Sequence, residues 1–380
     1  MPTGHEPPDE MPLGFTRGLV WGLTPWEIVI IESPQETSDC GACFFAAIRS
    51  ISIQQHMTTM KALRIVSLLM FLLLPLLMFG SDANKTPLII ENLAVEEMED
   101  GTVRHQFSVP SASMGRGISA AVVLPPEYHE EGFADRRYPV LYALHGRAAP
   151  FLAYTNMAPL RRRMHKCPFI LVVFHADTAS WYLDATKEPS SQFTTFFFAE
   201  LIPAIEATYR TRTDRGGRAV TGFSMGGFGA FHYMLTHPDR FGSVSALSGA
   251  FAVTGERGGT PHSGLESLLG DFADHSADYL RHGIQDRLEQ YVQSRTSLPA
   301  LYLHCGTGDY LIDQNRELAQ FLVGLNQQRH EVDPGNTITF QYRESPGAHN
   351  WLFWRDASSA IADFHCEVFA MEPSRLGYSE

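Results

Sequence analysis

The sequence predicts an α/β fold in which a mostly parallel sheet is covered by helices on both faces. Two observations lead to this prediction: short apolar runs end in turn residues, and helical patterns lie between them. A parallel strand that is buried on both faces reads as a continuous apolar run, and alternation of such runs with helices is typical of a parallel sheet. The chain has 380 residues with 44% apolar composition, enough to build a large core.

The expected strands follow one another in a definite order. Two segments of β character come first, roughly Arg104–Val109 and Ser119–Val123. The sheet itself is expected from six later runs, which read YPVLYALHG, PFILVVFHA, RAVTGFS, VSALSG, PALYLHCG and ITFQYRES. Helices are predicted around Phe196–Tyr209 and Gly226–Thr236. The segment Thr254–Pro299 is expected to be a small, partly helical insertion over the strand ends.

The region 57–83 has the form of a signal peptide. After Met60 come two basic residues and then fifteen residues, Ile65–Phe79, interrupted only by Ser67 and Pro75. This length suits the apolar region of a signal peptide and is short for a membrane-spanning helix of about 20 residues. We therefore expect an exported protein with its enzyme domain at 84–380, and retention of the segment as a membrane anchor is the alternative.

Residues 1–56 precede this signal-like segment and are turn-rich and acidic, without sustained periodicity. A signal peptide normally begins a protein. The interpretation is that 1–56 is a disordered or spurious upstream extension and that translation starts at Met57 or Met60.

Charge and cysteine content exclude several classes of function. The formal net charge of −13 argues against a surface for nucleic acid or anionic membrane. The one dense basic stretch is interpreted as the solvated face of a surface helix; it comprises Arg161, Arg162, Arg163 and Lys166.

Cys40 and Cys43 lack a second metal-ligand pair. The remaining three cysteines leave at least one free thiol, and the disulfide state stays open; they are Cys167, Cys305 and Cys366.

The stretch VTGFSMGGFGA holds the candidate nucleophile. Gly222-x-Ser224-x-Gly226 lies between an expected strand and an expected helix. That context is typical of a nucleophile elbow, a strained turn that exposes the serine hydroxyl. Small residues are needed there because Cβ atoms would clash with neighbouring backbone, and the following helix directs its N-terminus at the reacting centre.

A serine needs a base, and the base needs a carboxylate that orients it. Ligands of open α/β sheets bind at the carboxyl ends of the strands. Asp309 follows the fifth run and His349 follows the sixth, in the chain order Ser, Asp, His. Asp313 is the competing carboxylate. The other downstream histidines are disfavoured because they lie within a run or lack the strand-then-loop setting; they are His304, His330 and His365.

The oxyanion of an acyl-transfer intermediate needs two backbone N–H donors. Met225, directly after the nucleophile, is the first candidate, and Arg147 in the loop after LHG is the second. His145 is interpreted as a structural residue of that loop. Five aromatic residues next to these positions in sequence are candidates for a substrate pocket, with core packing as the alternative; they are Trp181, Tyr182, Phe223, Tyr310 and Trp351.

Taken together, these motifs resemble the putative esterase family of α/β-hydrolases, which includes S-formylglutathione hydrolase (esterase D), feruloyl and acetyl-xylan esterases, tributyrin-type esterases and mycolyltransferases. The likeness spans roughly Val103 to the C-terminus; it rests on LPPEY, YPVLYALHG, SWYLD, ELIPAIEATYR, GFSMGGFGA with HPDRF, CGTGD and PGAHNWLFW. It implies the α/β-hydrolase fold and an unlidded serine hydrolase of carboxylic esters that uses Ser224, Asp309 and His349.

The chain departs from this family at two loops. It has Arg147-Ala148-Ala149-Pro150 where tributyrin-type members often have a Gly-Asn pair, and His175-Ala176-Asp177 where relatives often have Pro-Asp-Gly. The second loop shapes the acyl pocket, so the ester is left open between small-molecule and polysaccharide substrates. The alternatives are an acyltransferase with a sugar or lipid acceptor and a non-catalytic binding module. No cofactor or metal is expected.

Overall fold

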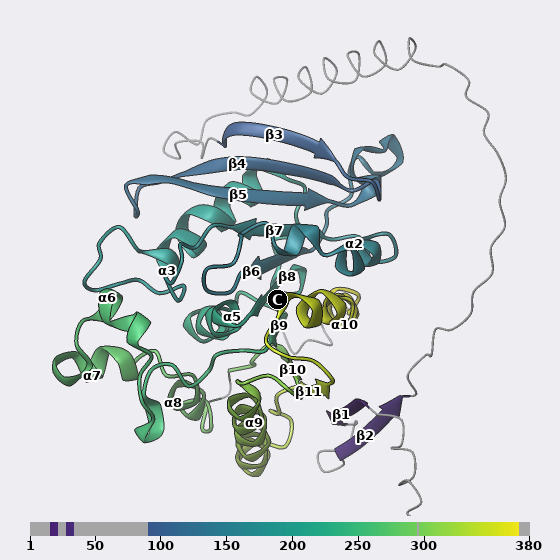
Figure 1. Cartoon of the computed structure of the whole chain (residues 1–380). Helices are drawn as coiled ribbons and strands as arrows, with labels where there is room; N and C mark the ends of the chain where they lie inside the picture. The colour runs from purple at the N-terminus through teal and green to yellow at the C-terminus, as the bar shows by residue number, and fades with distance from the viewer. Residues whose placement is uncertain (1–15, 22–27, 34–89, 295, 372–380) are drawn as a thin grey trace, which may run out of the picture. The chain divides into compact units, whose positions relative to one another are not determined.

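The computed structural model describes residues 16–21, 28–33, 90–294 and 296–371. Its strands form one sheet of eleven, in the order β2-β1-β11-β10-β9-β8-β6-β7-β5-β4-β3. The six strands in the middle of this order, from β11 to β7, are parallel (Figure 1). They are the six apolar runs of the sequence: β6 Val140–Leu144, β7 Ile170–Phe174, β8 Arg218–Phe223, β9 Ser243–Leu247, β10 Ala300–Gly306 and β11 Phe340–Ser345.

Antiparallel strands extend the sheet beyond β7. The hairpin of β4 (Val103–Ser111) and β5 (Arg116–Leu124) confirms the two early β segments, and β5 pairs with β7. β3, Glu91–Glu97, was not predicted. Its seven residues are all exposed, so the sequence ENLAVEE shows no buried face that would mark a strand.

At the other edge, β1 (Thr16–Trp21) pairs with β11, and β2 (Ile28–Ser33) pairs with β1, both antiparallel. Both strands lie within 1–56, where the sequence predicts no regular structure. The rest of that segment, and the predicted signal peptide at 57–83, lie outside the described residues and stay predictions. Among the described residues, no helix has the length and apolar character that a membrane crossing requires.

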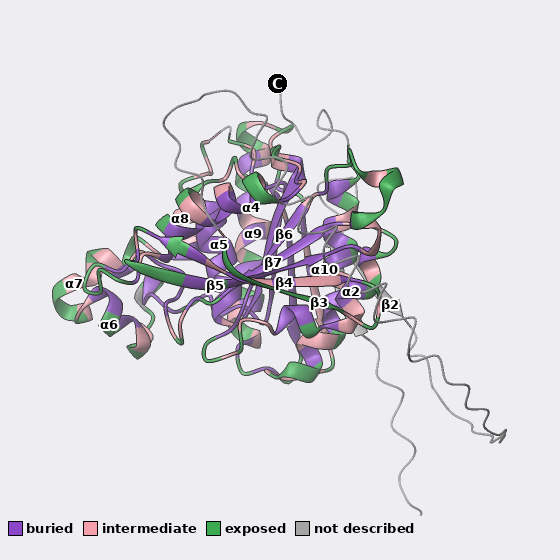
Figure 2. Cartoon of the chain, turned by 90° about the horizontal axis from the view of Figure 1, so that it is seen from above, coloured by how far each residue is buried: buried purple, intermediate pink, exposed green. Residues whose placement is uncertain are grey.

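Helices cover both faces of the sheet, as predicted. α2 (Ala158–Met164) and α10 (Trp351–Phe369) pack on one face against Leu141 and Ala143 of β6. α5 (Met225–Thr236) and α9 (Ile312–Val332) pack on the other face with Val140 and Tyr142. Figure 2 shows buried strands between these two groups of helices. β6 thus alternates its side chains between two apolar cores, which explains its uninterrupted apolar sequence.

The predicted helix around Phe196–Tyr209 is longer and less regular than expected. It begins as α3 (Phe193–Thr195), widens into a π-helical turn, η5 (Phe196–Leu201), and continues as α4 (Ile202–Thr208). Pro203 is the second residue of α4, just beyond the wide turn. Because proline cannot donate a backbone hydrogen bond and clashes with the preceding turn of a regular helix, a local change of helical register is the expected response.

The interpretation of the basic stretch as a fully solvated face is wrong for Arg161. That side chain is buried, with 8% exposure, and donates to Asp100 Oδ2 at 2.7 Å and to the Thr155 carbonyl at 2.6 Å. Arg163 pairs with Asp363 of α10. The short α2 is therefore held by the buried Arg161 and by an exposed ion pair, which charge counting along the sequence does not reveal.

The insertion between β9 and β10 is partly helical, as predicted; it contains η7 (Glu256–Gly258), η8 (Ser263–Leu265), α6 (Glu266–Leu269), α7 (Phe272–Leu280) and α8 (Ile284–Glu289). Its position differs in part from the expectation. α8 packs against α5 and α9, beside the sheet. Nearer the start of the insertion, the ring of His262 lies 4.9 Å from that of Trp181, in the segment that follows β7.

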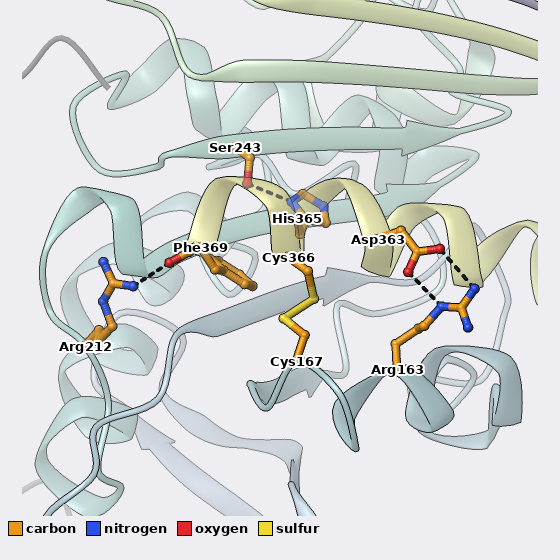
Figure 3. Close-up of a disulfide and its surroundings, with 8 residues drawn as sticks. All are labelled: Arg163, Cys167, Arg212, Ser243, Asp363, His365, Cys366 and Phe369. Carbon is orange, nitrogen blue, oxygen red and sulfur yellow. Dashed lines mark hydrogen bonds and ion pairs between the residues drawn. A yellow bond between two sulfur atoms is a disulfide. The ribbon is translucent and has the colours of Figure 1, made fainter. Parts of the chain in front are cut away.

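Cys167 and Cys366 form a disulfide that joins the loop before β7 to α10, with 6.1 Å between their Cα atoms (Figure 3). Cys305 is a free, buried thiol, so the expectation of at least one free thiol is confirmed. A hollow of about 520 Å³ lies at this disulfide; it is lined by Arg163, Lys166, Cys167, Asp363, Cys366 and Glu367.

Candidate active site

Ser224 occupies a strained turn between β8 and α5. Its φ of 56° and ψ of −119° lie outside the regions that serine ordinarily adopts. A Cβ at Gly222 would lie 2.1 Å from the Gly226 carbonyl oxygen, and a Cβ at Gly226 would lie 2.0 Å from the Leu144 carbonyl oxygen. The flanking glycines are therefore required by backbone crowding, as the sequence predicts.

The structure brings Ser224, His349 and Asp309 together from three separate loops. The Ser224 hydroxyl lies 2.9 Å from His349 Nε2. His349 Nδ1 lies 3.0 Å from both carboxylate oxygens of Asp309. These loops follow β8, β10 and β11, whose carboxyl ends meet at one edge of the sheet because the strands are parallel.

Asp309 is held as an anion. Burial by itself raises the pKa of this carboxyl, but hydrogen bonds from His349, Ser248 and the Leu311 N–H outweigh it and lower the pKa below its ordinary value. The Leu311 N–H donates to Oδ1 at 2.8 Å. Asp313, the competing carboxylate, instead lies on the first turn of α9 with an exposed side chain paired to Arg316.

The two predicted oxyanion donors are free to bind a ligand. The N–H groups of Met225 and Arg147 donate to no acceptor within the described part of the chain. The loop that carries Arg147 runs against the nucleophile, since a Cβ at Gly146 would lie 3.3 Å from Ser224 Cβ. An N–H in the first turn of a helix and a second one in an adjacent loop suit a developing oxyanion.

His145 has the structural role that the sequence suggests. It is buried, its Nδ1 lies 2.8 Å from the Gly146 carbonyl oxygen, and its Nε2 accepts the Ala176 N–H at 3.0 Å. Burial lowers its pKa to about 4, so the imidazole is neutral. It thereby connects the loops after β6 and β7.

The five aromatic candidates for the pocket fall into two groups. Tyr310 is 75% exposed with its ring 4.5 Å from that of His349, and Trp351 is 37% exposed at the start of α10. The other three are buried. Tyr182 donates to the His145 carbonyl at 2.8 Å, and Phe223 stacks on Trp354 at 4.4 Å. For these two, packing is the role that the structure shows.

Trp181 lies between the insertion and α5. Its ring makes edge contacts with His262 at 4.9 Å and Phe228 at 5.7 Å. Burial, and then the nearby Arg147 charge, lower the pKa of His262. His262 and the Arg147 side chain therefore belong to the surroundings of the site. Sequence reasoning missed His262, which lies in a loop without a recognisable motif.

Two further residues at the site were missed. Trp354 lies with its ring at 4.9 Å and nearly perpendicular to His349, and its indole N–H donates to Ser248 Oγ at 3.1 Å. Ser248, which hydrogen-bonds Asp309, comes directly after β9. The position just beyond a parallel strand was the signal for Ser248. Trp354 lies in the first turn of α10, whereas His349 precedes the helix, so no helical spacing connects the two in the sequence.

Within the described residues, no group of three or more His, Cys, Asp or Glu side chains is placed to hold a metal ion. The arrangement described above has the parts of a nucleophilic centre: a hydroxyl, an imidazole nitrogen within hydrogen-bond distance of it, a buried carboxylate and backbone N–H groups.

Comparison with known proteins agrees with this geometry. The family model described as "Putative esterase" matches residues 111–363. An esterase from Mycobacterium tuberculosis is 29% identical over 266 residues, which are 62% of this chain and 55% of the relative. The chain thus spans about half the length of that relative. An acetyl esterase from Caldicellulosiruptor saccharolyticus is 24% identical, covering 66% of this chain and 92% of the relative.

Solved structures show the same fold. A ferulic acid esterase superposes with a TM-score of 0.57 at 24% identity, over 70% of this chain and 98% of the other. An S-formylglutathione hydrolase from Agrobacterium tumefaciens gives 0.56 at 22% identity, over 74% and 99%. With the family match over residues 111–363, these findings establish that the chain belongs to the esterase family of α/β-hydrolases.

Proposed function

We propose that this chain is an exported serine carboxylic-ester hydrolase that works through an acyl-enzyme. One observation carries the proposal: the Ser224 hydroxyl, the His349 imidazole and the Asp309 carboxylate form a continuous hydrogen-bonded series at a strained turn. The esterase family match and the esterase relatives support carboxylic-ester chemistry.

The first half of the reaction forms the acyl-enzyme. His349 Nε2 takes the proton of Ser224 as Oγ attacks the ester carbonyl carbon, and the carbonyl oxygen becomes an oxyanion that accepts from the Met225 and Arg147 N–H groups. As the intermediate collapses, the bond to the alkoxy oxygen breaks and His349 returns the proton to that oxygen. The alcohol leaves, and the acyl group stays on Ser224.

The second half hydrolyses the acyl-enzyme. A water gives its proton to His349 and attacks the acyl carbon, and the proton then goes to Ser224 Oγ as the acid departs. Asp309 accepts a hydrogen bond from the His349 Nδ1–H throughout the reaction. It fixes the tautomer and stabilises the imidazolium in both halves.

Two observations support export. The segment 57–83 has the pattern of a signal peptide. In addition, the Cys167–Cys366 disulfide suits an oxidising compartment better than the cytosol.

For the substrate, the printed names of relatives point to acetyl and feruloyl esters. We propose an ester of small-molecule or polysaccharide alcohols with a short or aromatic acyl group. The exposed Tyr310 ring beside His349 provides an apolar surface for such a group, and Trp351 at the start of α10 is also exposed.

The test combines labelling with turnover. A fluorophosphonate probe should label Ser224, and the protein should hydrolyse p-nitrophenyl acyl esters of graded length, acetyl-xylan or methyl ferulate. Ser224→Ala should abolish both signals with nearly unchanged thermal stability. Product analysis with a carbohydrate acceptor separates hydrolysis from acyl transfer. A folded wild-type protein that neither reacts with the probe nor cleaves any of these esters would refute the proposal.

A further inference from the structure

A second series of polar contacts leads to Asp309, separate from its contact with His349. It starts on α10, where Trp354 Nε1 donates to Ser248 Oγ at 3.1 Å. The Ser248 side chain in turn lies close enough to the Asp309 carboxyl to lower its pKa as a hydrogen-bonding partner. Neither Trp354 nor Ser248 takes part in the chemistry described above.

The direction of these hydrogen bonds is fixed by the groups involved. An indole N–H only donates, so Ser248 Oγ accepts it, and an ionised carboxylate only accepts, so the Ser248 hydroxyl donates its proton to Asp309. The Cys305 thiol also contacts Ser248, but burial raises its pKa to about 12, so it is neutral. Asp309 is the stronger acceptor because a charge-assisted hydrogen bond outweighs one to a thiol.

The backbone of Ser248 has an unusual conformation. Ser248 is fully buried and adopts a φ of 48°, in the left-handed region that favours glycine. Its N–H donates to the His304 carbonyl at 2.9 Å. A serine kept at such an angle within a tightly packed core is a strain that stability alone does not explain.

Trp354 also contacts His349 and Phe223, the residue before the nucleophile. Its ring stands edge-on to His349, with 4.9 Å between centroids, and stacks on Phe223 at 4.4 Å. Phe223 immediately precedes Ser224. One side chain therefore touches the histidine, supports the residue before the nucleophile, and orients the serine that binds the carboxylate.

We propose that Ser248 and Trp354 are positioning residues of this active site, which hold the Asp309 carboxylate in the orientation that receives the His349 Nδ1 hydrogen. The inference rests on the proposed function of Ser224, Asp309 and His349. Without the Ser248 hydroxyl, Asp309 can rotate, and His349 loses part of its orientation during proton transfer.

The test compares Trp354→Phe, Ser248→Ala and the double variant. Phenylalanine keeps a ring against Phe223 and His349 and removes only the indole donor. Each single variant should lower kcat on the order of 10- to 100-fold, with KM nearly unchanged. The kcat of the double variant should be no lower than that of Ser248→Ala, because Trp354 Nε1 acts through Ser248. Ser358→Ala is the matched control, a buried serine on α10 that donates to the Arg355 carbonyl at 2.6 Å.

Stability distinguishes positioning from packing. Ser248→Ala leaves the Trp354 N–H buried without an acceptor, which lowers stability, and the double variant removes that orphaned donor. Stability should recover in the double variant while kcat stays low. Recovery of kcat together with stability, or wild-type kcat in the single variants, would overturn the inference.

A spectroscopic readout keeps this test separate from that of the proposed function. The downfield proton NMR resonance of His349 Nδ1–H should move in Ser248→Ala and Trp354→Phe and stay in place in Ser358→Ala. An unmoved resonance would contradict the inference even if the enzyme is active. A wild-type protein without esterase activity would refute the proposed function and leave this measurement valid.

Discussion

His349 Nδ1 lies 3.0 Å from each carboxylate oxygen of Asp309. Because Nδ1 must carry a hydrogen to make this contact, Nε2 is left as the acceptor that faces the Ser224 hydroxyl at 2.9 Å. The pairing thus selects the imidazole tautomer that the proposed mechanism needs.

Asp309→Asn should lower kcat by about 10⁴-fold, because an amide can stabilise the wrong tautomer and cannot stabilise imidazolium. Steady-state kinetics on a p-nitrophenyl ester measure the effect. Asp313→Asn, a change at the exposed carboxylate of α9, is the matched control and should keep wild-type kcat. Similar losses of kcat in both variants would contradict the role of Asp309 as the carboxylate that orients His349.

Gly226→Ala should unfold or strongly destabilise the protein, by roughly 3 kcal/mol or more, because the new Cβ would meet the Leu144 carbonyl oxygen at 2.0 Å. Gly324→Ala in α9 is the control, since a Cβ there meets nothing within 4 Å. That change should stabilise the helix by roughly 0.5–1 kcal/mol. Chemical denaturation compares the two, and equal midpoints would show that the turn at Ser224 is not crowded.

Stability should fall on acidification because of His365 on α10. Its Nδ1 lies 2.7 Å from Ser243 Oγ, its Nε2 lies 2.8 Å from Ser245 Oγ, and burial lowers its pKa to about 3 (Figure 3). The unfolded chain takes up this proton near pH 6.5 and the folded chain only near pH 3. The contribution of neutral His365 to the free energy of unfolding is therefore complete above pH 6.5 and is lost as the pH falls toward 3.

Between those pH values, His365→Asn should flatten the pH dependence of the free energy of unfolding by roughly 1 kcal/mol per pH unit. Denaturation at several pH values measures it, with His165→Asn at an exposed position as the control. Other buried histidines with lowered pKa values act in the same direction; they are His105, His145, His232 and His304. An unchanged slope in His365→Asn would contradict the assignment.

Reduction of the Cys167–Cys366 disulfide should lower stability by roughly 2–5 kcal/mol, since the bond closes a loop with a sequence separation of 199. The double variant Cys167→Ser/Cys366→Ser should behave like the reduced protein. Thermal melts with and without a reductant test this, and Cys305→Ser controls for general thiol effects. A reductant that lowers the melting temperature of the double variant as much as that of the wild type would show that the disulfide is not the cause.

Much of the fold could be predicted from the sequence because its strands are buried on both faces. The six parallel strands appear as uninterrupted apolar runs, and the glycines around Ser224 mark the turn between β8 and α5. The exposed β3 carries no such pattern. Pro203 disfavours a regular helix before it, but the sequence alone does not specify that the change takes the form of the π-helical turn η5.

The order of the strands and helices, the turn at Ser224 and the candidates Asp309 and His349 could all be predicted from the amino-acid sequence. Each of these features depends on a short stretch of neighbouring residues at the end of a strand. Tertiary structure decided the rest. It brought Trp354 and Ser248 to Asp309, buried Tyr182 and Phe223 while leaving Tyr310 exposed, and joined Cys167 to Cys366. Such contacts join residues far apart in the chain, and packing in three dimensions alone selects which of them meet.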